Sequence, residues 1–408
     1  MKKLNLAAAT CLLSAVFATS ITSAAQTLTT LVSFNGANGE DPYFGSLAQD
    51  TNGNIYGVTL SGGPGGGQCT NGQGFGCGTI FQITPDGAFS TLYTFCSQEN
   101  CSDGIIPTGS LAYDSSGNLY GTAQSGGANF NGTVFQITPE GVLTTLYSFC
   151  SETNCADGSD PGAGLVALGG DFYGTTQSGG ASGVGTIFKI TASGQLTTLH
   201  SFCSETNCAD GEVVYGAMIA ADGKLWGTTL GGGKNNLGTV FSTTTAGKFK
   251  AVHSFNAIDG AEPSGGLLYA NGKFYGTTDG GGARDDGTVF EMTASGKLTT
   301  LYNFCAEIDC PDGVAPLGGL VQGTNGNLFG TTEAGGKNFR GTVFEITPTG
   351  NLTTIYNFCS KKKCADGEYP YAGLIQGSDG ELYGTTTGGG DFSCSPPNGC
   401  GTVFSLTE

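Results

Sequence analysis

Residues 28–34 read Leu-Thr-Thr-Leu-Val-Ser-Phe, and residues 401–404 read Gly-Thr-Val-Phe. Each stretch is one copy of a phrase that recurs along the chain. Copies of the first phrase end at Phe34, Phe95, Phe149, Phe202, Phe255, Phe304 and Phe358. Copies of the second end at Phe81, Phe135, Phe188, Phe241, Phe290, Phe344 and Phe404. A third phrase, an aromatic residue before Gly-x-[Thr/Ala], starts at Tyr56, Tyr120, Tyr173, Trp226, Tyr275, Phe329 and Tyr383.

The order of these phrases favours a closed ring. Successive copies are 49 to 64 residues apart, which is typical of propellers, solenoids and other repeat arrays. A solenoid needs atypical capping repeats at its ends. Here the chain opens with the last phrase of a unit and closes with the middle phrase, so the two leftover pieces make one whole unit. We therefore predict that the N-terminal strand completes the last unit.

One unit, residues 318–358, contains four short segments rich in β-branched and aromatic residues, separated by turn residues. The predicted strands are 318–322, 328–332, 341–347 and 352–358. Four strands per unit predict a propeller blade. The sequence therefore predicts an all-β, seven-bladed β-propeller over residues 26–408. Glycines that begin the first strand suit the crowded axis. The two short turns of each blade share one face, and we expect function on the opposite face, where the longer loops lie.

Residues 1–25 have the pattern of a secretory signal peptide. Lys2 and Lys3 precede a largely apolar stretch, and Ser23-Ala24-Ala25 is a small-residue cleavage site. The apolar stretch is too short for a membrane span, and no second one follows. We expect a secreted or periplasmic protein that does not span a membrane.

Fourteen cysteines remain after this segment, in seven local couples. Even, paired spacing in an exported chain predicts disulfides rather than a zinc site, which needs four ligands brought together. The predicted pairs are Cys69–Cys77, Cys96–Cys101, Cys150–Cys155, Cys203–Cys208, Cys305–Cys310, Cys359–Cys364 and Cys394–Cys400. Five of them accompany a four-residue insertion in the connection between blades.

The composition excludes several partners and chemistries. Without Lys2 and Lys3, 13 basic residues face 33 acidic ones, so the surface repels nucleic acid and anionic membranes. The two histidines, His200 and His253, occupy a strand position that is tyrosine in four other units, which indicates packing. Catalysis that depends on histidine is therefore not expected. We expect a monomer without a cofactor.

An Asp-Gly pair follows most blade connections, with Asn38 at the equivalent position in the remaining one. Such an aspartate can accept hydrogen bonds from backbone amides in a turn. The alternative is calcium binding, although one carboxylate per loop supplies few of the six to eight oxygens that calcium needs. The candidates are Asp103, Asp157, Asp210, Asp259, Asp312 and Asp366.

Departures from the sevenfold pattern mark the candidate ligand site. The longest loops between second and third strands belong to blades one and seven, at 61–77 and 388–400, and only these loops contain their own cysteine couples. The connections that lead into the same two blades contain aromatic residues, and aromatic faces are common in binding surfaces. The only arginines lie in the equivalent loops of blades five and six, where an acidic neighbour such as Asp285 or Asp286 is the simpler partner. The candidate residues are Tyr43, Phe44, Tyr369, Tyr371, Asp391, Arg284 and Arg340. The alternative is that the long loops only reinforce the seam where the ring closes.

The combined phrases Leu-Tyr-Gly-Thr-Thr, Gly-Thr-Val-Phe and Leu-Thr-Thr-Leu-Tyr-Ser-Phe resemble the Gloeobacter/Verrucomicrobia (GloVer) tandem repeat of exported bacterial proteins, over residues 27–408. The resemblance implies export and repeats but no catalytic residues. The main hypothesis is a module that binds a glycan or an extracellular protein near blades one and seven. One alternative is a polysaccharide lyase or glycosidase, for which Tyr43, Tyr371, Asp391 and Arg340 are the candidates. Another is a structural component of the cell envelope.

Overall fold

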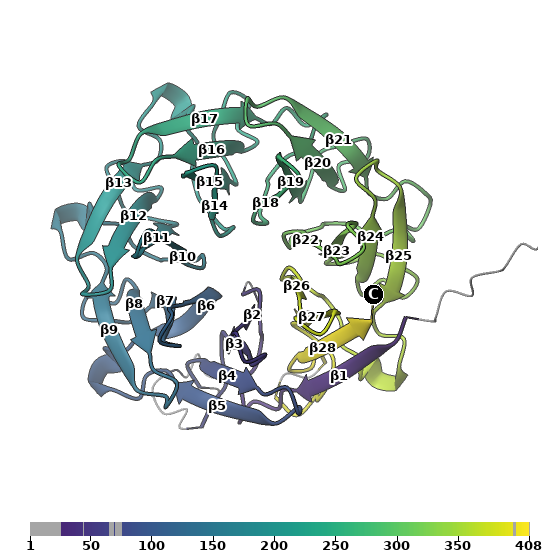
Figure 1. The fold of residues 1–408 in the computed structure, drawn as a ribbon, viewed down its shortest axis with the longest axis horizontal. Helices are drawn as coiled ribbons and strands as arrows, with labels where there is room; N and C mark the ends of the chain where they lie inside the picture. The colour runs from purple at the N-terminus through teal and green to yellow at the C-terminus, as the bar shows by residue number, and fades with distance from the viewer. Residues whose placement is uncertain (1–25, 44, 65–68, 70–75, 395–396, 408) are drawn as a thin grey trace, which may run out of the picture.

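The fold is a closed ring of radial sheets. The structure, a computed structural model, describes residues 26–43, 45–64, 69, 76–394 and 397–407. Within these residues, strands β1 to β28 form seven four-stranded antiparallel sheets around a central axis (Figure 1). The predicted seven-bladed propeller is confirmed. The described residues include no helix that is long and apolar enough to cross a membrane.

In blades one to six the strands follow one another from the axis outward in chain order, and in blade seven the N-terminal strand takes the outermost place. The innermost strands are β2 (Ala48–Gln49), β6 (Ile105–Tyr113), β10 (Val166–Leu168), β14 (Ile219–Ala221), β18 (Leu268–Ala270), β22 (Val321–Gln322) and β26 (Ile375–Gln376). The second strands are β3 (Ile55–Thr59), β7 (Leu119–Ser125), β11 (Asp171–Thr176), β15 (Lys224–Thr229), β19 (Lys273–Thr278), β23 (Leu328–Thr332) and β27 (Glu381–Thr386). The third strands are β4 (Thr79–Ile83), β8 (Thr133–Ile137), β12 (Thr186–Thr191), β16 (Thr239–Thr243), β20 (Thr288–Met292), β24 (Thr342–Ile346) and β28 (Thr402–Thr407). The outermost strands are β5 (Phe89–Thr94), β9 (Leu143–Ser148), β13 (Leu196–Ser201), β17 (Phe249–Ser254), β21 (Leu298–Asn303), β25 (Leu352–Asn357) and β1 (Leu28–Ser33).

The N-terminal strand closes the ring, as predicted. Strand β1 pairs antiparallel with β28, and Figure 1 shows the two ends of the chain side by side in blade seven. The pairing runs from Leu28 opposite Leu406 to Ser33 opposite Thr402. The amide of Phe34 then donates to the Gly401 carbonyl at 3.0 Å. Hydrogen bonds between distant parts of the chain therefore hold the last blade together.

Six of the seven innermost strands, all but β6, contain only two or three residues and are shorter than the sequence indicates. The predicted segment 318–322 contains only two strand residues, Val321 and Gln322. The preceding glycines instead pack against the next blade: a Cβ on Gly318 would lie 2.7 Å from the Gly373 amide nitrogen. Backbones of neighbouring blades thus meet at the axis, which explains why these positions are glycine.

Phenylalanines from two of the repeated phrases pack between adjacent blades. The last residue of each outer-strand phrase contacts the phenylalanine of the third-strand phrase in the next blade, edge to face, with ring centroids 5.2 to 5.5 Å apart. The pairs are Phe34–Phe81, Phe95–Phe135, Phe149–Phe188, Phe202–Phe241, Phe255–Phe290, Phe304–Phe344 and Phe358–Phe404. The two phrases therefore encode the contact that joins one blade to the next.

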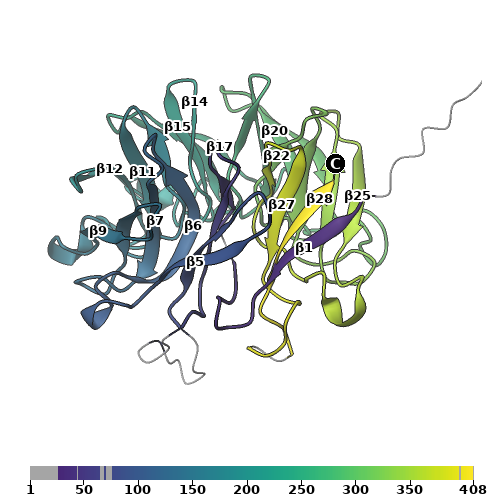
Figure 2. The ribbon, with the colours of Figure 1, turned by 60° about the horizontal axis from the view of Figure 1, so that its bottom comes forward.

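The two faces of the ring differ in their connections. Short turns join the first to the second strand and the third to the fourth strand on one face, here called the turn face. The loops between second and third strands, and the connections between blades, lie on the other, here called the loop face. In Figure 2 the long β27–β28 connection projects from the lower edge of the ring, which is the loop face.

Candidate ligand-binding site

Backbone hydrogen bonds fix the blade connections on the loop face. Asp41 and Tyr369 are equivalent residues of two connections, and both have left-handed φ angles, +54° and +58°. The Asp41 amide donates to the Cys400 carbonyl at 3.2 Å, and the Tyr369 amide donates to the Arg340 carbonyl at 3.0 Å. Each connection is therefore tied to the loop of the preceding blade. These hydrogen bonds fix the backbone from which the side chains after Asp41 and Tyr369 project.

A pocket of about 620 Å³ opens on the loop face between blades six, seven and one. Its volume lies within the usual range for small-ligand sites. Three aromatic residues that the sequence singles out lie in its wall. The lining residues are Asp41, Tyr43, Leu60, Glu333, Tyr369, Tyr371, Thr387, Gly388 and Asn398. We call it the tyrosine pocket.

Two of the tyrosines form a contact across the ring closure. The rings of Tyr43 and Tyr371 lie with centroids 4.3 Å apart and planes inclined by 35°. The Tyr371 hydroxyl donates to Oε1 of Glu333 at 2.5 Å. Burial, and then this neighbouring carboxylate, raise the pKa of Tyr371 well above its usual range. The hydroxyl therefore stays protonated and acts as a hydrogen-bond donor.

Carboxyl groups crowd the same region. Burial raises the pKa of the Asp41 carboxyl, an effect that a hydrogen bond from Ser61 partly offsets. Burial and the neighbouring Asp41 raise the pKa of Glu40 to about 7. Burial also raises the pKa of Asp279 to about 6, with a further contribution from Glu262, Glu333 and Asp285. Burial is thus the main cause of these raised pKa values, and repulsion between neighbouring acids adds to it at Glu40 and Asp279.

A second, smaller cavity of about 160 Å³ lies on the propeller axis. It is lined mainly by the glycine-rich starts of the innermost strands, together with Tyr215 and Tyr371. Because Tyr371 borders both cavities, the tyrosine pocket lies beside the loop-face end of the axial cavity.

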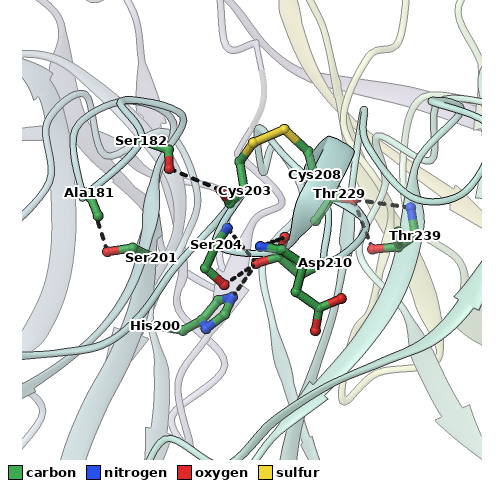
Figure 3. Close-up of polar contacts among 11 residues, drawn as sticks. Ala181, Ser182, His200, Ser201, Cys203, Ser204, Cys208, Asp210, Thr229 and Thr239 are labelled. Carbon is green, nitrogen blue, oxygen red and sulfur yellow. Dashed lines mark hydrogen bonds and ion pairs between the residues drawn. A yellow bond between two sulfur atoms is a disulfide. The ribbon is translucent and has the colours of Figure 1, made fainter.

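The Asp-Gly carboxylates close the blade connections through hydrogen bonds. Figure 3 shows His200 and Ser204 pointing at Asp210, below the Cys203–Cys208 disulfide. Oδ2 of Asp210 lies 3.0 Å from the His200 ring nitrogen and accepts from the Ser204 amide at 3.0 Å and hydroxyl at 2.7 Å. Asp157 accepts equivalent bonds, with a tyrosine hydroxyl in place of the imidazole.

The same arrangement holds at Asp103 and Asp366. Asp312 accepts from the Tyr302 hydroxyl and the Ala306 amide, without a serine hydroxyl. Asp259 pairs with His253 in a connection without a disulfide. Histidine thus replaces tyrosine as the partner of a turn carboxylate, as its strand position indicates. Calcium binding by these aspartates remains a prediction.

The predicted disulfides are all present. They join Cys69–Cys77, Cys96–Cys101, Cys150–Cys155, Cys203–Cys208, Cys305–Cys310, Cys359–Cys364 and Cys394–Cys400. In four of the five stapled connections the second cysteine ends a short 3₁₀ turn, namely η1 (Glu99–Cys101), η2 (Thr153–Cys155), η3 (Thr206–Cys208) and η4 (Lys362–Cys364). Each possible metal-ligand group among the described residues includes a disulfide-bonded cysteine, which has no thiolate to offer.

Comparison with known families agrees with the repeated phrases. The model of the Gloeobacter/Verrucomicrobia repeat matches residues 14–210 and again 203–404. The chain belongs to this repeat family. No curated protein matches the sequence significantly.

Solved structures similar to this repeat protein include a luciferin-regenerating enzyme, with 11% identity, coverage of 94% of this chain and 95% of that one, and a TM-score of 0.46. A putative 6-phosphogluconolactonase from Bacteroides uniformis has 13% identity, coverage of 78% and 85%, and a TM-score of 0.48. A putative gluconolactonase has 12% identity, coverage of 94% and 93%, and a TM-score of 0.42. Similarities this distant carry no information about the activity of this family member.

The remaining candidates lie at the edge of the pocket or away from it. Arg340 stacks over the Tyr369 ring, 5.1 Å from its centroid, and its Nε lies 3.1 Å from Oε2 of Glu368. Arg284 does not contact the expected carboxylate; its guanidinium donates to the Ala306 and Glu307 carbonyls. Asp391 is exposed and accepts from the Ser393 amide within its own loop. Phe44 lies outside the described residues, as does the predicted signal peptide.

Sequence reasoning missed three residues of this region: Asp41, Glu333 and Tyr215. Asp41 and Glu333 line the tyrosine pocket, and Tyr215 lines the axial cavity. Glu333 occupies a repeated position that is glutamine in blades two and three, at Gln124 and Gln177, and Tyr215 occupies the same repeated position as Tyr43 and Tyr371. The position of Asp41 varies between blades and is aspartate again at Asp160. The comparison of equivalent positions that indicated Tyr371 would have found Glu333 and Tyr215 too, but not Asp41.

Proposed function

We propose that this protein is an exported glycan-binding module and that the tyrosine pocket is its binding site. The observation that carries the proposal is the meeting of Tyr43, Tyr369 and Tyr371, from two blade connections, with the carboxylates of Asp41 and Glu333 in one pocket. Sugar rings present both apolar C–H faces and hydroxyl groups. Tyrosine rings pack against the apolar faces, and carboxylate oxygens accept hydrogen bonds from the hydroxyl groups.

The size of the pocket favours a sugar over a protein partner. A stable protein interface buries about 800 Å² on each side, whereas a pocket of about 620 Å³ encloses a ligand of a few rings. The seven disulfides are typical of proteins outside the cytoplasm, where polysaccharides are accessible.

Binding to a panel of immobilised polysaccharides tests the proposal. We expect the protein to be retained by at least one of them, and the Tyr43→Ala, Tyr371→Ala double variant to lose that retention. Tyr113→Ala is the matched control, since Tyr113 is 43% exposed at the turn-face end of β6. Unchanged retention of the double variant would show that the site lies elsewhere.

A glycosidase is the second candidate function, because the structure places two carboxyl groups, Asp41 and Glu333, in one pocket. Glycoside hydrolysis uses such a pair, one as acid and one as base or nucleophile. The same panel separates the two functions: shortened chains in the supernatant indicate an enzyme, and retention of intact chains indicates a binding module.

A further inference from the structure

The residue at the end of the second strand differs in charge from blade to blade. Equivalent positions at the end of the second strand are glutamines in blades two and three, where Gln124 donates to Gln177 at 3.3 Å. In blades five and six the same positions are Asp279 and Glu333. At this repeated position, therefore, only blades five and six place a carboxylate, and that of Glu333 lines the tyrosine pocket.

None of the nine described residues that line the pocket is basic. The nearest guanidinium, that of Arg340, lies against Tyr369 and is paired with Glu368. The other arginine, Arg284, is engaged by two backbone carbonyls. The pKa of Asp279, which burial raises first, is raised further by the neighbouring acids Glu262, Glu333 and Asp285.

The contact of Arg340 is an example, within the protein, of a cation held by an aromatic ring and a carboxylate. Its guanidinium lies between an aromatic ring and a carboxylate, an arrangement that attracts cations through both the ring quadrupole and the opposite charge. The tyrosine pocket offers the same two kinds of group to a ligand: the rings of Tyr43 and Tyr371 beside the carboxylates of Asp41 and Glu333.

We propose that the ligand of the tyrosine pocket is a cationic glycan, one whose sugars carry free amino groups, as in a glucosamine polymer. The inference rests on the proposed function and adds the chemical class of the ligand. An ammonium group would lie against the tyrosine rings and pair with the carboxylates, while the hydroxyl groups use the remaining acceptors. The same charges exclude acidic polysaccharides, since desolvated like charges repel strongly.

Calorimetric titration with three tetrasaccharides tests this proposal: glucosamine, N-acetylglucosamine and glucose oligomers. The buffer is mildly acidic, so that amines and ordinary carboxylates are both charged, and contains EDTA, so that no divalent cation bridges ligand and protein. We expect the glucosamine oligomer to bind about tenfold more tightly than the other two, or about 1.4 kcal/mol. Added salt should reduce this advantage, because screening weakens the attraction.

Two variants separate the pocket from the acidic surface as a whole. Glu333→Gln keeps an acceptor for the Tyr371 hydroxyl but removes the charge. Glu140→Gln removes the same charge from an exposed position in the β8–β9 turn, on the turn face. We expect the first variant to lose most of the preference for glucosamine and the second to keep it.

Each outcome has a distinct meaning. Equal or tighter binding of the N-acetylated or neutral oligomer would overturn the cationic ligand and leave glycan binding intact. Equal losses in the two variants would overturn it as well, because the attraction would then come from the whole surface. Failure of all three oligomers and of the polysaccharide panel would overturn the proposed function itself.

Discussion

Phe34→Ala tests ring closure, on which the pocket between blades six, seven and one depends. The Phe34 side chain is fully buried and packs in one cluster with Phe81, Leu47 and Val403, which belong to blades one and seven. Its ring lies edge to face with Phe81, with centroids 5.4 Å apart. This residue thus joins the outer strand of blade seven to the core of blade one.

The expected loss follows from this burial. Truncating a buried phenylalanine to alanine costs about 4 kcal/mol through lost transfer energy and the cavity that remains. A chain of 408 residues has an unfolding entropy of about 0.9 kcal/mol per kelvin near the transition, so the melting temperature should fall by about 5 °C. Phe202→Ala removes the equivalent contact within the continuous chain and should lower it by a similar amount.

Thermal unfolding followed by near-UV circular dichroism measures this effect. Phe130→Ala is the matched control, because Phe130 is 68% exposed and the same truncation there should change the melting temperature by less than about 1 °C. If Phe34→Ala behaves like the exposed control, β1 does not contribute to the core and the ring is not closed by it.

Three further predictions concern the axis, one histidine and the disulfides. Gly318→Ala should lower the free energy of unfolding, measured in urea, by about 2 kcal/mol, because its Cβ would lie 2.7 Å from the Gly373 nitrogen. Gly266→Ala, whose Cβ would lie 3.2 Å from its nearest atom, should lower it less. The reverse order would contradict close backbone packing at the axis. Burial of the imidazole lowers the pKa of His200 below 6.5, so on acidification this histidine binds a proton in the unfolded chain before it does so in the folded one. Lowering the pH from about 7 to 5 should therefore destabilise the unsubstituted protein more than it destabilises the His200→Tyr variant. Identical pH profiles of melting temperature would argue against a buried neutral imidazole. Thiol titration of the denatured, unreduced mature protein should find almost no free thiol, and a large free pool would contradict the seven disulfides.

Much of the fold could be predicted because each repeated phrase encodes a contact as well as a strand. The phenylalanines that end two of the phrases meet between blades, and seven copies of that contact require seven blades. The split of one unit between the two ends of the chain indicated closure, and β1 pairs with β28 accordingly. What the repeats could not show is where strand pairing stops, as at Val321, because packing of glycine backbones between blades replaces it.

The candidate site was only partly predictable, for a geometric reason. Tyr43, Tyr369 and Tyr371 stand out because their positions are not aromatic in most other units, and the structure gathers them in one pocket. Glu333 comes from a different element, the end of β23 in the preceding blade. Its proximity to Tyr371 depends on the twist and spacing of two blades, which the linear pattern does not contain.

A sevenfold scaffold separates structural from functional positions more clearly than an irregular fold does. A residue type that repeats in most blades, such as the Asp-Gly carboxylates, has the same hydrogen bonds in each and serves the connection itself. The position before the innermost strand, by contrast, is Thr108, Gly162, Ser264 or Leu317 in four blades and tyrosine in the other three, at Tyr43, Tyr215 and Tyr371. The fold does not need tyrosine there, since the four other blades form without it. Tyr43 and Tyr371 line the tyrosine pocket with Glu333, and Tyr215 and Tyr371 line the axial cavity. This common location, at positions where the fold accepts other residues, is the argument for the proposed ligand binding on the loop face.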